Sequence, residues 1–319
     1  MNPFTSRPAD SVAALGERLL IVEMRKWLGK TSPRAPFGIG DDCAVVSSTG
    51  KPMLITTDPV IYGGHFNDSM SPREAAAKLL RRNLSDIAAM GGRPIAAVLS
   101  LALPAQTSLR WLRAFYRGIA ADARRFRVKI VGGDITQTAP GFLGAFLTLH
   151  GEAAAARVVT RTGARAGDAI FVTGTLGGSL LGHHCNFTPR LAEGAWLASR
   201  EEIRAMMDVS DGIAKDLGSL TPPGLVPALV GAAIPISAAA KRMARRSGRA
   251  PLAHALSDGE DYELLFIVSG PSDAEEFARA WRRQFPRVQL TKLGVFVPRG
   301  ELPADALRLG DYHGYEHFR

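Results

Sequence analysis

Aspartates recur in this sequence where a strand-like run ends or a glycine turn begins. Five of them, Asp42, Asp58, Asp134, Asp208 and Asp211, occupy such positions, and a sixth, Asp86, lies within the otherwise apolar helix predicted over 72–90. Each one alone could be a turn residue, a helix cap or an exposed helix position. If they converge on one site, they repel one another unless cations lie between them. Hard oxygen ligands without Cys or His partners point to Mg²⁺, which usually also holds phosphates, so the pattern indicates nucleotide chemistry.

The stretch "MMDVSDGIAKDLGSL", residues 206–220, concentrates this feature at one strand-to-helix junction. The local pattern predicts that Ser210 is the N-cap of the helix and that Asp211 lies against the positive end of its dipole. The recurrence of aspartates along the chain suggests that the same junction also presents Asp208 and Asp211 to metal ions. No standard phosphate loop accompanies them, because Met24 stands where Walker A requires a glycine before "GKT".

The elements that would position these residues fall into two successive blocks. Helices are predicted by apolar spacing and capping signals over 11–28, 72–90, 111–119, 189–205, 237–247 and 273–283. Strands are predicted over 43–46, 53–56, 95–103, 128–134, 142–152, 169–174, 262–268 and 292–297, and a further element of unassigned type over 228–234. We therefore expect two domains, residues 1–152 and 153–319, of mixed α/β and α+β character.

Bulk properties limit the class of protein. The chain has 319 residues, 46% of them hydrophobic and 22% charged, which is ordinary globular composition. The absence of a long apolar run and of a signal-peptide pattern predicts a soluble, cytoplasmic protein without a membrane span. The net charge of +9 arises partly from basic runs at 124–129 and 241–246. These runs lack nucleic-acid motifs and are interpreted as solvated helix faces, so no nucleic-acid partner is expected; a non-catalytic basic binding protein is the remotest alternative.

Taken in order, the motifs resemble those of the thiamine-monophosphate kinases, of the aminoimidazole ribonucleotide synthetase-like superfamily. The resemblance is carried by "GIGDDCAVV", "TTDPVIYGGHF", "NLSDIAAMGG", "VGGDIT", "TRTGARAGD", "DVSDGIAKDLG", "SDGEDYEL" and "GYEHF". It implies an N-terminal α/β domain whose sheets pair into a barrel across a homodimer, followed by an α+β domain. It also implies that ATP phosphorylates thiamine monophosphate to thiamine diphosphate, with several Mg²⁺ ions as cofactors.

The resemblance also assigns roles to individual residues. Metal ligands would be Asp42, Thr56, Thr57, Asp58, Asp86, Asp134, Asp208 and Asp211. ATP would be contacted by Gly133, Asp134, Arg161 and Ser210, and the acceptor by His65, Glu260 and either Tyr315 or Tyr312. No residue is assigned as an obligatory general base, because a phosphate monoester with a second pKa of about 6 is already mostly dianionic at neutral pH.

The chain departs from the family pattern on the acceptor side. The short connection "LGHHCNF", residues 181–187, stands where the family usually has a longer helical segment, and Asp258 replaces a usual glycine. A related ATP-dependent enzyme that acts on another small acceptor is therefore the alternative interpretation.

Overall fold

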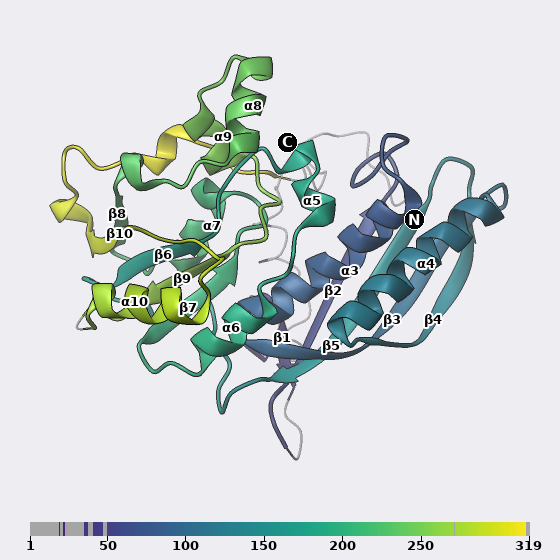
Figure 1. Ribbon diagram of the computed structural model, residues 1–319, viewed down its shortest axis with the longest axis horizontal. Helices are drawn as coiled ribbons and strands as arrows, with labels where there is room; N and C mark the ends of the chain where they lie inside the picture. Colours follow the sequence, from purple (N-terminus) through teal and green to yellow (C-terminus); the bar gives the residue numbers. More distant parts are fainter. Residues whose placement is uncertain are drawn as a thin grey trace.

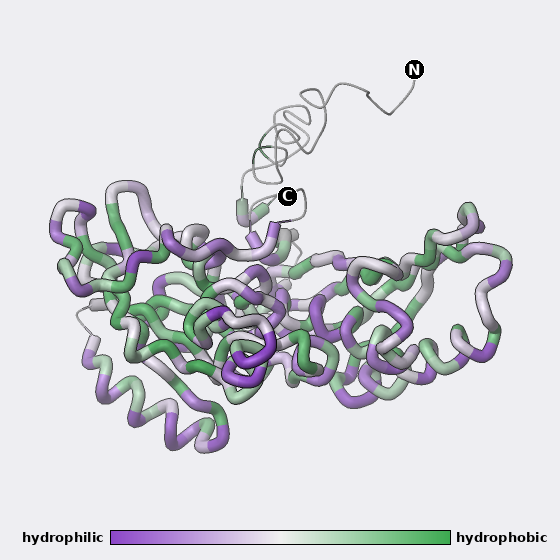
Figure 2. Tube along the Cα trace, turned by 90° about the horizontal axis from the view of Figure 1, so that it is seen from above, coloured by the Kyte–Doolittle hydropathy of each residue, from purple (hydrophilic) through white to green (hydrophobic). Residues whose placement is uncertain are grey.

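The computed structural model describes residues 41–46, 50–270 and 272–316, together with residues 19, 22 and 35–37. Figures 1 and 2 show two lobes side by side, each built on one β-sheet, with hydrophobic stretches running through both. Among the described residues, no helix is both long enough and apolar enough to cross a membrane. The expected mixed α/β architecture with two sheets is confirmed.

The N-terminal lobe holds a five-stranded sheet in the order β1-β2-β5-β3-β4. All neighbouring strands are antiparallel except β3 and β4, which are parallel and joined through α4. Helices α3 and α4 lie on the same face of this sheet (Figure 1). The elements are β1 (Ala44–Val46), β2 (Met53–Ile61), α3 (Pro72–Ala89), β3 (Gly92–Pro104), α4 (Leu109–Phe126), β4 (Lys129–Thr138) and β5 (Gly144–Ala153).

The second lobe holds an antiparallel sheet in the order β7-β9-β6-β10-β8. Its strands are β6 (Ala169–Thr173), β7 (Ile203–Asp208), β8 (Leu225–Leu229), β9 (Leu264–Val268) and β10 (Leu290–Pro298). Its helices are α5 (His183–Asn186), α6 (Leu191–Ala198), α7 (Ile213–Leu220), α8 (Ala238–Ser247), α9 (Pro251–Ser257) and α10 (Ala274–Gln284). Short 3-10 turns are η3 (Ser179–Leu181), η4 (Gly231–Ala233), η5 (Arg299–Glu301) and η6 (Leu309–Asp311).

Helix α3 is common to both lobes. The predicted capping box starts it: the Ser71 hydroxyl accepts from the Glu74 backbone N–H, and the Glu74 carboxylate accepts from the Ser71 N–H. Its apolar side buries Leu84 and other residues against the N-terminal sheet, while its opposite side contacts α5, α6 and β7. The approach to α6 is close because a Cβ on Gly194 would lie 2.1 Å from the Ala88 carbonyl oxygen. Therefore α3 has little solvent-exposed surface.

Most predicted elements are confirmed, with strand and helix ends shifted by a few residues. The prediction of a helix over 189–205 is wrong at its end, because residues 203–205 belong to β7 and pair with β9. Helices α5 and α9 were not predicted. The predicted helix over 11–28 lies outside the described residues, apart from Leu19 and Val22, which are helical.

Candidate active site

A cavity of about 800 Å³ opens between the lobes. Residues predicted from the sequence that line it are Asp42, Thr56, Thr57, Asp58, His65, Asp86, Arg161, Asp208, Ser210, Asp211, Glu260 and Tyr315. Segments more than 200 residues apart in the chain thus meet at one place, since β2 and α3 supply one wall and the turns after β7 and before β9 supply the other. Predicted residues outside the cavity are Gly133, Asp134 and Tyr312.

Three carboxylates gather at one end of the cavity. Oxygens of Asp42, Asp86 and Asp208 lie within 4.8 Å of one another. Burial raises the pKa of Asp208 to about 8, with the Asp42 charge adding to the shift. Burial, followed by the charges of Asp58 and Asp208, raises the pKa of Asp86 well above its usual value. So much unfavourable charge in a small volume fits a site for divalent cations, which would favour the ionised carboxylates.

Hydroxyl groups orient two of these carboxylates. Thr56 donates a hydrogen bond to Asp86 Oδ2 at 2.5 Å, and Ser85 donates to Asp208 Oδ2 at 2.5 Å. Ser85 directly precedes Asp86 on α3. This helix therefore supplies the Asp86 carboxylate and, through the Ser85 hydroxyl, orients the Asp208 carboxylate at the end of β7. The candidate metal-ligand atoms of the cluster are carboxylate and hydroxyl oxygens, which is the ligand set that Mg²⁺ prefers.

One cluster carboxylate and two neighbouring carboxylates are paired with cationic side chains. Arg161 forms a two-pronged ion pair with Asp42, with both N···O distances 2.9 Å. Arg82 Nη2 lies 3.1 Å from Asp58, and Lys215 Nζ lies 2.7 Å from Asp211. Within the cluster, Asp42 therefore has a cationic partner, whereas Asp86 and Asp208 are bonded to hydroxyl groups.

The junction after β7 differs from the sequence-based prediction in one respect. Ser210 is not the N-cap of α7; Gly212 is, with φ of 97°, and no side chain caps the helix there. The backbone conformation at residue 212 favours glycine, which moves the helix start beyond the predicted cap. The Ser210 carbonyl instead accepts a 2.7 Å hydrogen bond from the Glu260 N–H. The two motifs "DVSDG" and "DGEDY" are thereby tied together at the cavity wall.

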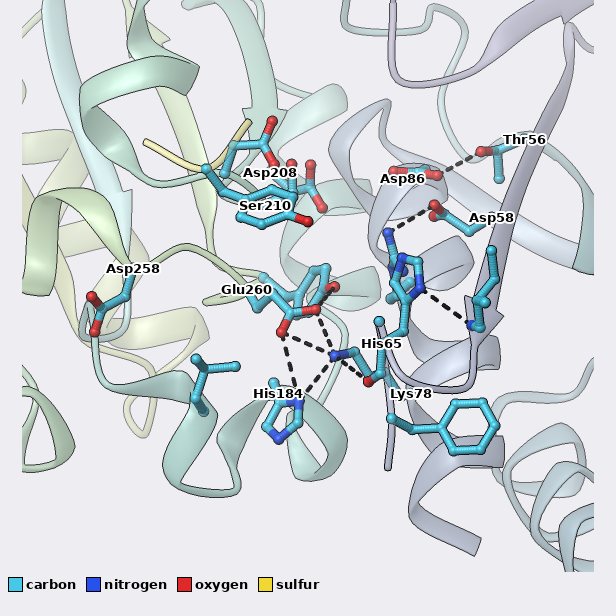
Figure 3. A pocket seen from close by; sticks show the side chains of 18 of the residues that line it. Thr56, Asp58, His65, Lys78, Asp86, His184, Asp208, Ser210, Asp258 and Glu260 are labelled. Carbon is cyan, nitrogen blue, oxygen red and sulfur yellow. Dashed lines mark hydrogen bonds and ion pairs between the residues drawn. The ribbon is translucent and has the colours of Figure 1, made fainter. Parts of the chain in front are cut away.

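The other end of the cavity is organised by Lys78, which the sequence analysis did not identify. Its ammonium group lies 2.8 and 3.0 Å from the two Glu260 oxygens, 3.0 Å from the His65 carbonyl oxygen and 3.1 Å from His184 Nδ1. Figure 3 shows Lys78 between Glu260 and His184, with Asp86 and Asp58 farther along the cavity. Burial lowers the Lys78 pKa, although the Glu260 charge opposes the shift. Predicted acceptor residues of both lobes are thus joined by one buried cation.

His184 comes from α5, within the short connection that departs from the family pattern. Burial lowers its pKa, and the Lys78 charge adds to the effect. Because an ammonium group only donates, His184 Nδ1 acts as the acceptor, which places the proton of the neutral ring on Nε2. His65 Nδ1 similarly accepts from the Ile61 N–H at 3.2 Å. The sequence offered one signal for Lys78: it lies two helical turns before Asp86 on α3.

Tyr315 and Tyr312 are separated by the structure. Tyr315 lines the cavity; its N–H donates to the Asp211 carbonyl at 2.9 Å, and its own carbonyl accepts from Lys215 at 2.9 Å. Tyr312 packs against the hydrophobic core of the second lobe instead. Of the two predicted aromatic residues, only Tyr315 is therefore placed to contact a molecule in the cavity.

Gly133 and Asp134 lie on β4, at the edge of the N-terminal sheet, and both are exposed. Strands β5 and β3 separate them from β2. At Gly133 a Cβ would lie 1.9 Å from the Leu99 carbonyl oxygen, so only glycine allows β4 to approach β3 there. Within a single chain these two residues do not join the other predicted site residues.

Comparisons with known proteins identify the family. Residues 40–153 match the family model described as AIR synthase related protein, N-terminal domain. The chain is 39% identical over 281 residues to a thiamine-monophosphate kinase of Rhodopirellula baltica, covering 84% of this chain and 85% of the relative. It is 36% identical over 339 residues to that of Salmonella typhimurium, covering 96% and 99%.

Solved structures agree with this assignment. A structure described as "AaThiL complexed with AMPPCP and TMP" superposes with a TM-score of 0.79 at 29% identity, covering 98% of this chain and 99% of the other. The thiamine monophosphate kinase of Aquifex aeolicus superposes with a TM-score of 0.73 at 29% identity, covering 87% and 93%. Sequence motifs, fold and relatives lead to one conclusion: the chain belongs to the thiamine-monophosphate kinase family.

Proposed function

We propose that this protein transfers the γ-phosphoryl group of ATP to thiamine monophosphate, producing thiamine diphosphate and ADP. The observation that carries the proposal is the Asp42–Asp86–Asp208 cluster at one end of a cavity of about 800 Å³. Its support from relatives is the 39% identity to a thiamine-monophosphate kinase.

The metal ligands of this proposal are Asp134, outside the cavity of its own chain, and the seven cavity residues Asp42, Thr56, Thr57, Asp58, Asp86, Asp208 and Asp211. Magnesium ions held there would screen the charges of both phosphate-bearing ligands and stabilise the charge of an in-line transfer. Arg161 and Ser210 would contact ATP, and Glu260, His65 and Tyr315 would hold the acceptor. An oxygen of the acceptor's phosphate attacks the γ-phosphorus without a base, since it carries no proton that must be removed at neutral pH.

We also infer a cytoplasmic homodimer in which residues 1–152 and 153–319 are the two domains of each copy. Strand β4 is an uncovered edge with apolar residues on it: Val131 is 64% exposed and Ile135 is 66% exposed. An apolar sheet edge of this kind favours pairing with a second copy, as in a barrel formed across a dimer. Such pairing would bring Gly133 and Asp134 of one copy to the cavity of the other, where they would complete the ATP and metal site.

Turnover with defined substrates tests the proposed reaction. The protein is incubated with ATP, Mg²⁺ and thiamine monophosphate, ADP release is followed, and thiamine diphosphate is measured by chromatography. We expect one thiamine diphosphate for each ADP, and no product when EDTA removes the metal. Tight binding of Mg²⁺–ATP without any thiamine diphosphate would reject this acceptor and favour a different small molecule.

Mixed dimers test the shared site. Asp134→Asn and Asp86→Asn chains are each expected to be inactive, whereas dimers re-formed from an equal mixture should recover about a quarter of wild-type activity, because half of the dimers are mixed and each has one intact site. The matched control mixes Asp86→Asn with Asp208→Asn, whose defects lie in the same chain's cavity, and should recover nothing. Equal results for the two mixtures would place Asp134 outside a shared site.

A further inference from the structure

One face of α3 lines the length of the cavity with charged side chains. Lys78, Arg82 and Asp86 are spaced by four residues, so they lie in one row along the helix. At a rise of 1.5 Å per residue, the row is about 12 Å long. Lys78 marks the end that holds Glu260 and His184, and Asp86 marks the carboxylate cluster. Arg82 therefore lies between the acceptor end and the metal end.

The two cations in this row differ in how fully they are bonded. An ammonium group has three N–H bonds, and Lys78 directs them to Glu260, His184 and the His65 carbonyl. These contacts use its donors to hold protein groups in place. Lys78 is thus a positioning residue for the acceptor end and has no donor left for a phosphate.

Arg82 has unused donors. Of its five N–H bonds, one Nη1–H is directed to the Pro59 carbonyl at 3.0 Å, and Nη2 faces Asp58 at 3.1 Å. Its Nε is buried and has no hydrogen-bond acceptor among the described residues. The side chain is only 15% exposed, so water supplies little compensation. A buried donor without an acceptor is unfavourable, and it favours a rearrangement that gives the guanidinium group an anionic partner.

We propose that Arg82 binds the phosphate group of the acceptor, a phosphate monoester. The inference rests on the proposed function and adds a residue to it. Asp58 is among the proposed metal ligands, and when it turns to a metal ion the Nη2–H that faces it becomes available. Together with Nε–H this forms the planar fork that matches two phosphate oxygens. The acceptor's phosphate would then lie between Arg82 and the carboxylate cluster, beside the γ-phosphoryl group.

The alternative is that Arg82 only neutralises Asp58. The two roles differ in what they predict for ligands with and without a phosphate. A phosphate-binding arginine contributes to the affinity for thiamine monophosphate but not for thiamine. A residue that only neutralises Asp58 affects both ligands alike, through the metal or through the stability of the fold.

Calorimetric titration of the full chain with thiamine monophosphate and with thiamine, in Mg²⁺ without ATP, separates the two roles. In Arg82→Met we expect affinity for thiamine monophosphate to fall by about 10- to 100-fold, and that for thiamine to change by less than about threefold. Arg82→Lys keeps the positive charge without the paired N–H donors of the guanidinium group, so it should lose a smaller part of the preference for thiamine monophosphate over thiamine. This variant provides the test if Arg82→Met does not fold. Arg73→Met, an exposed position in the first turn of α3, is the matched control and should resemble wild type.

The outcomes also separate this inference from the proposed reaction. Equal losses for both ligands, or an unchanged preference for thiamine monophosphate in the variants, overturn the role of Arg82 while wild-type turnover leaves the kinase function standing. A wild-type protein that binds thiamine monophosphate no better than thiamine overturns the role as well. Absence of thiamine diphosphate formation by the wild type rejects the proposed function itself.

Discussion

Asp86→Asn is expected to abolish turnover while making the metal-free protein more stable. The substitution removes a proposed metal ligand, and because the bound ions would supply several kcal/mol of charge stabilisation, kcat should fall by about 1,000-fold or more. It also removes a buried carboxyl group whose ionised form is disfavoured by burial and by the charges of Asp58 and Asp208, which raise its pKa. The asparagine oxygen can still accept the Thr56 hydrogen bond. A cluster of carboxylates that binds cations is unfavourable in the metal-free fold, so removing one of them can increase stability at the expense of activity.

Thermal unfolding in EDTA together with steady-state kinetics measures both effects. Each kcal/mol gained should raise the melting temperature by roughly 2–4 °C in a chain of this size. Asp305→Asn, at an exposed position of the second lobe, is the control for loss of a single surface charge and should leave kcat and melting temperature unchanged. A folded Asp86→Asn protein with near-normal kcat would contradict the metal role of the cluster.

Stability of the metal-free protein is expected to decrease as the pH rises from about 5 to 8. The pKa of Asp208 is raised to about 8 in the folded protein, whereas an unfolded aspartate titrates near 3.9. Between these values the folded state retains a proton that the unfolded state has lost. The contribution of Asp208 to the free energy of unfolding is therefore fully present below the pKa of the unfolded state and is lost as the pH rises through the pKa of the folded state. The loss is up to about 1.4 kcal/mol per pH unit for each retained proton.

Melting temperatures in EDTA at pH 5, 6, 7 and 8 measure this slope. Mg²⁺ should flatten it, because a bound cation compensates the ionised carboxylates. Asp208→Asn should reduce it without abolishing it, since the pKa of Asp41 is also raised, to about 6. A melting temperature that is constant over this range in EDTA would show that the cluster does not retain protons in the folded state.

Local signals in the sequence predicted much of the fold. The capping box at Ser71 and the turn at Gly91 defined α3 because both act over a few residues. The helix expected over 189–205 ran too far because pairing of β7 with β9 depends on residues distant in the chain. Ser210 was predicted as the N-cap because serine is frequent at that position, whereas the backbone conformation of Gly212 sets the actual start of the helix.

The candidate site was predictable to the extent that its residues are acidic. Aspartates after strands suggest ligand binding, but Lys78 and Arg82 on a helix resemble ordinary surface residues. Lys78 is buried by contacts that α3 makes with the second lobe, and Arg82 pairs with Asp58 on β2; no local pattern specifies either contact. The sequence also could not predict how far Asp134 lies from the cavity. Asp134 was predicted at the end of a strand, but its distance from the cavity depends on the strand order of the sheet.

Helix α3 runs beside the whole cavity and fixes the distance between Lys78 at one end of the cavity and Asp86 at the other. In the proposed reaction the substrates carry four phosphorus atoms in all, and so do the products, because one phosphoryl group only changes its attachment. A rigid helix that keeps a constant distance between these groups therefore fits the substrates and the products equally well. The γ-phosphorus atom of ATP passes from one oxygen to the other while Lys78 and Asp86 keep their places on α3, so the chemical step requires no change in the distance between these two groups.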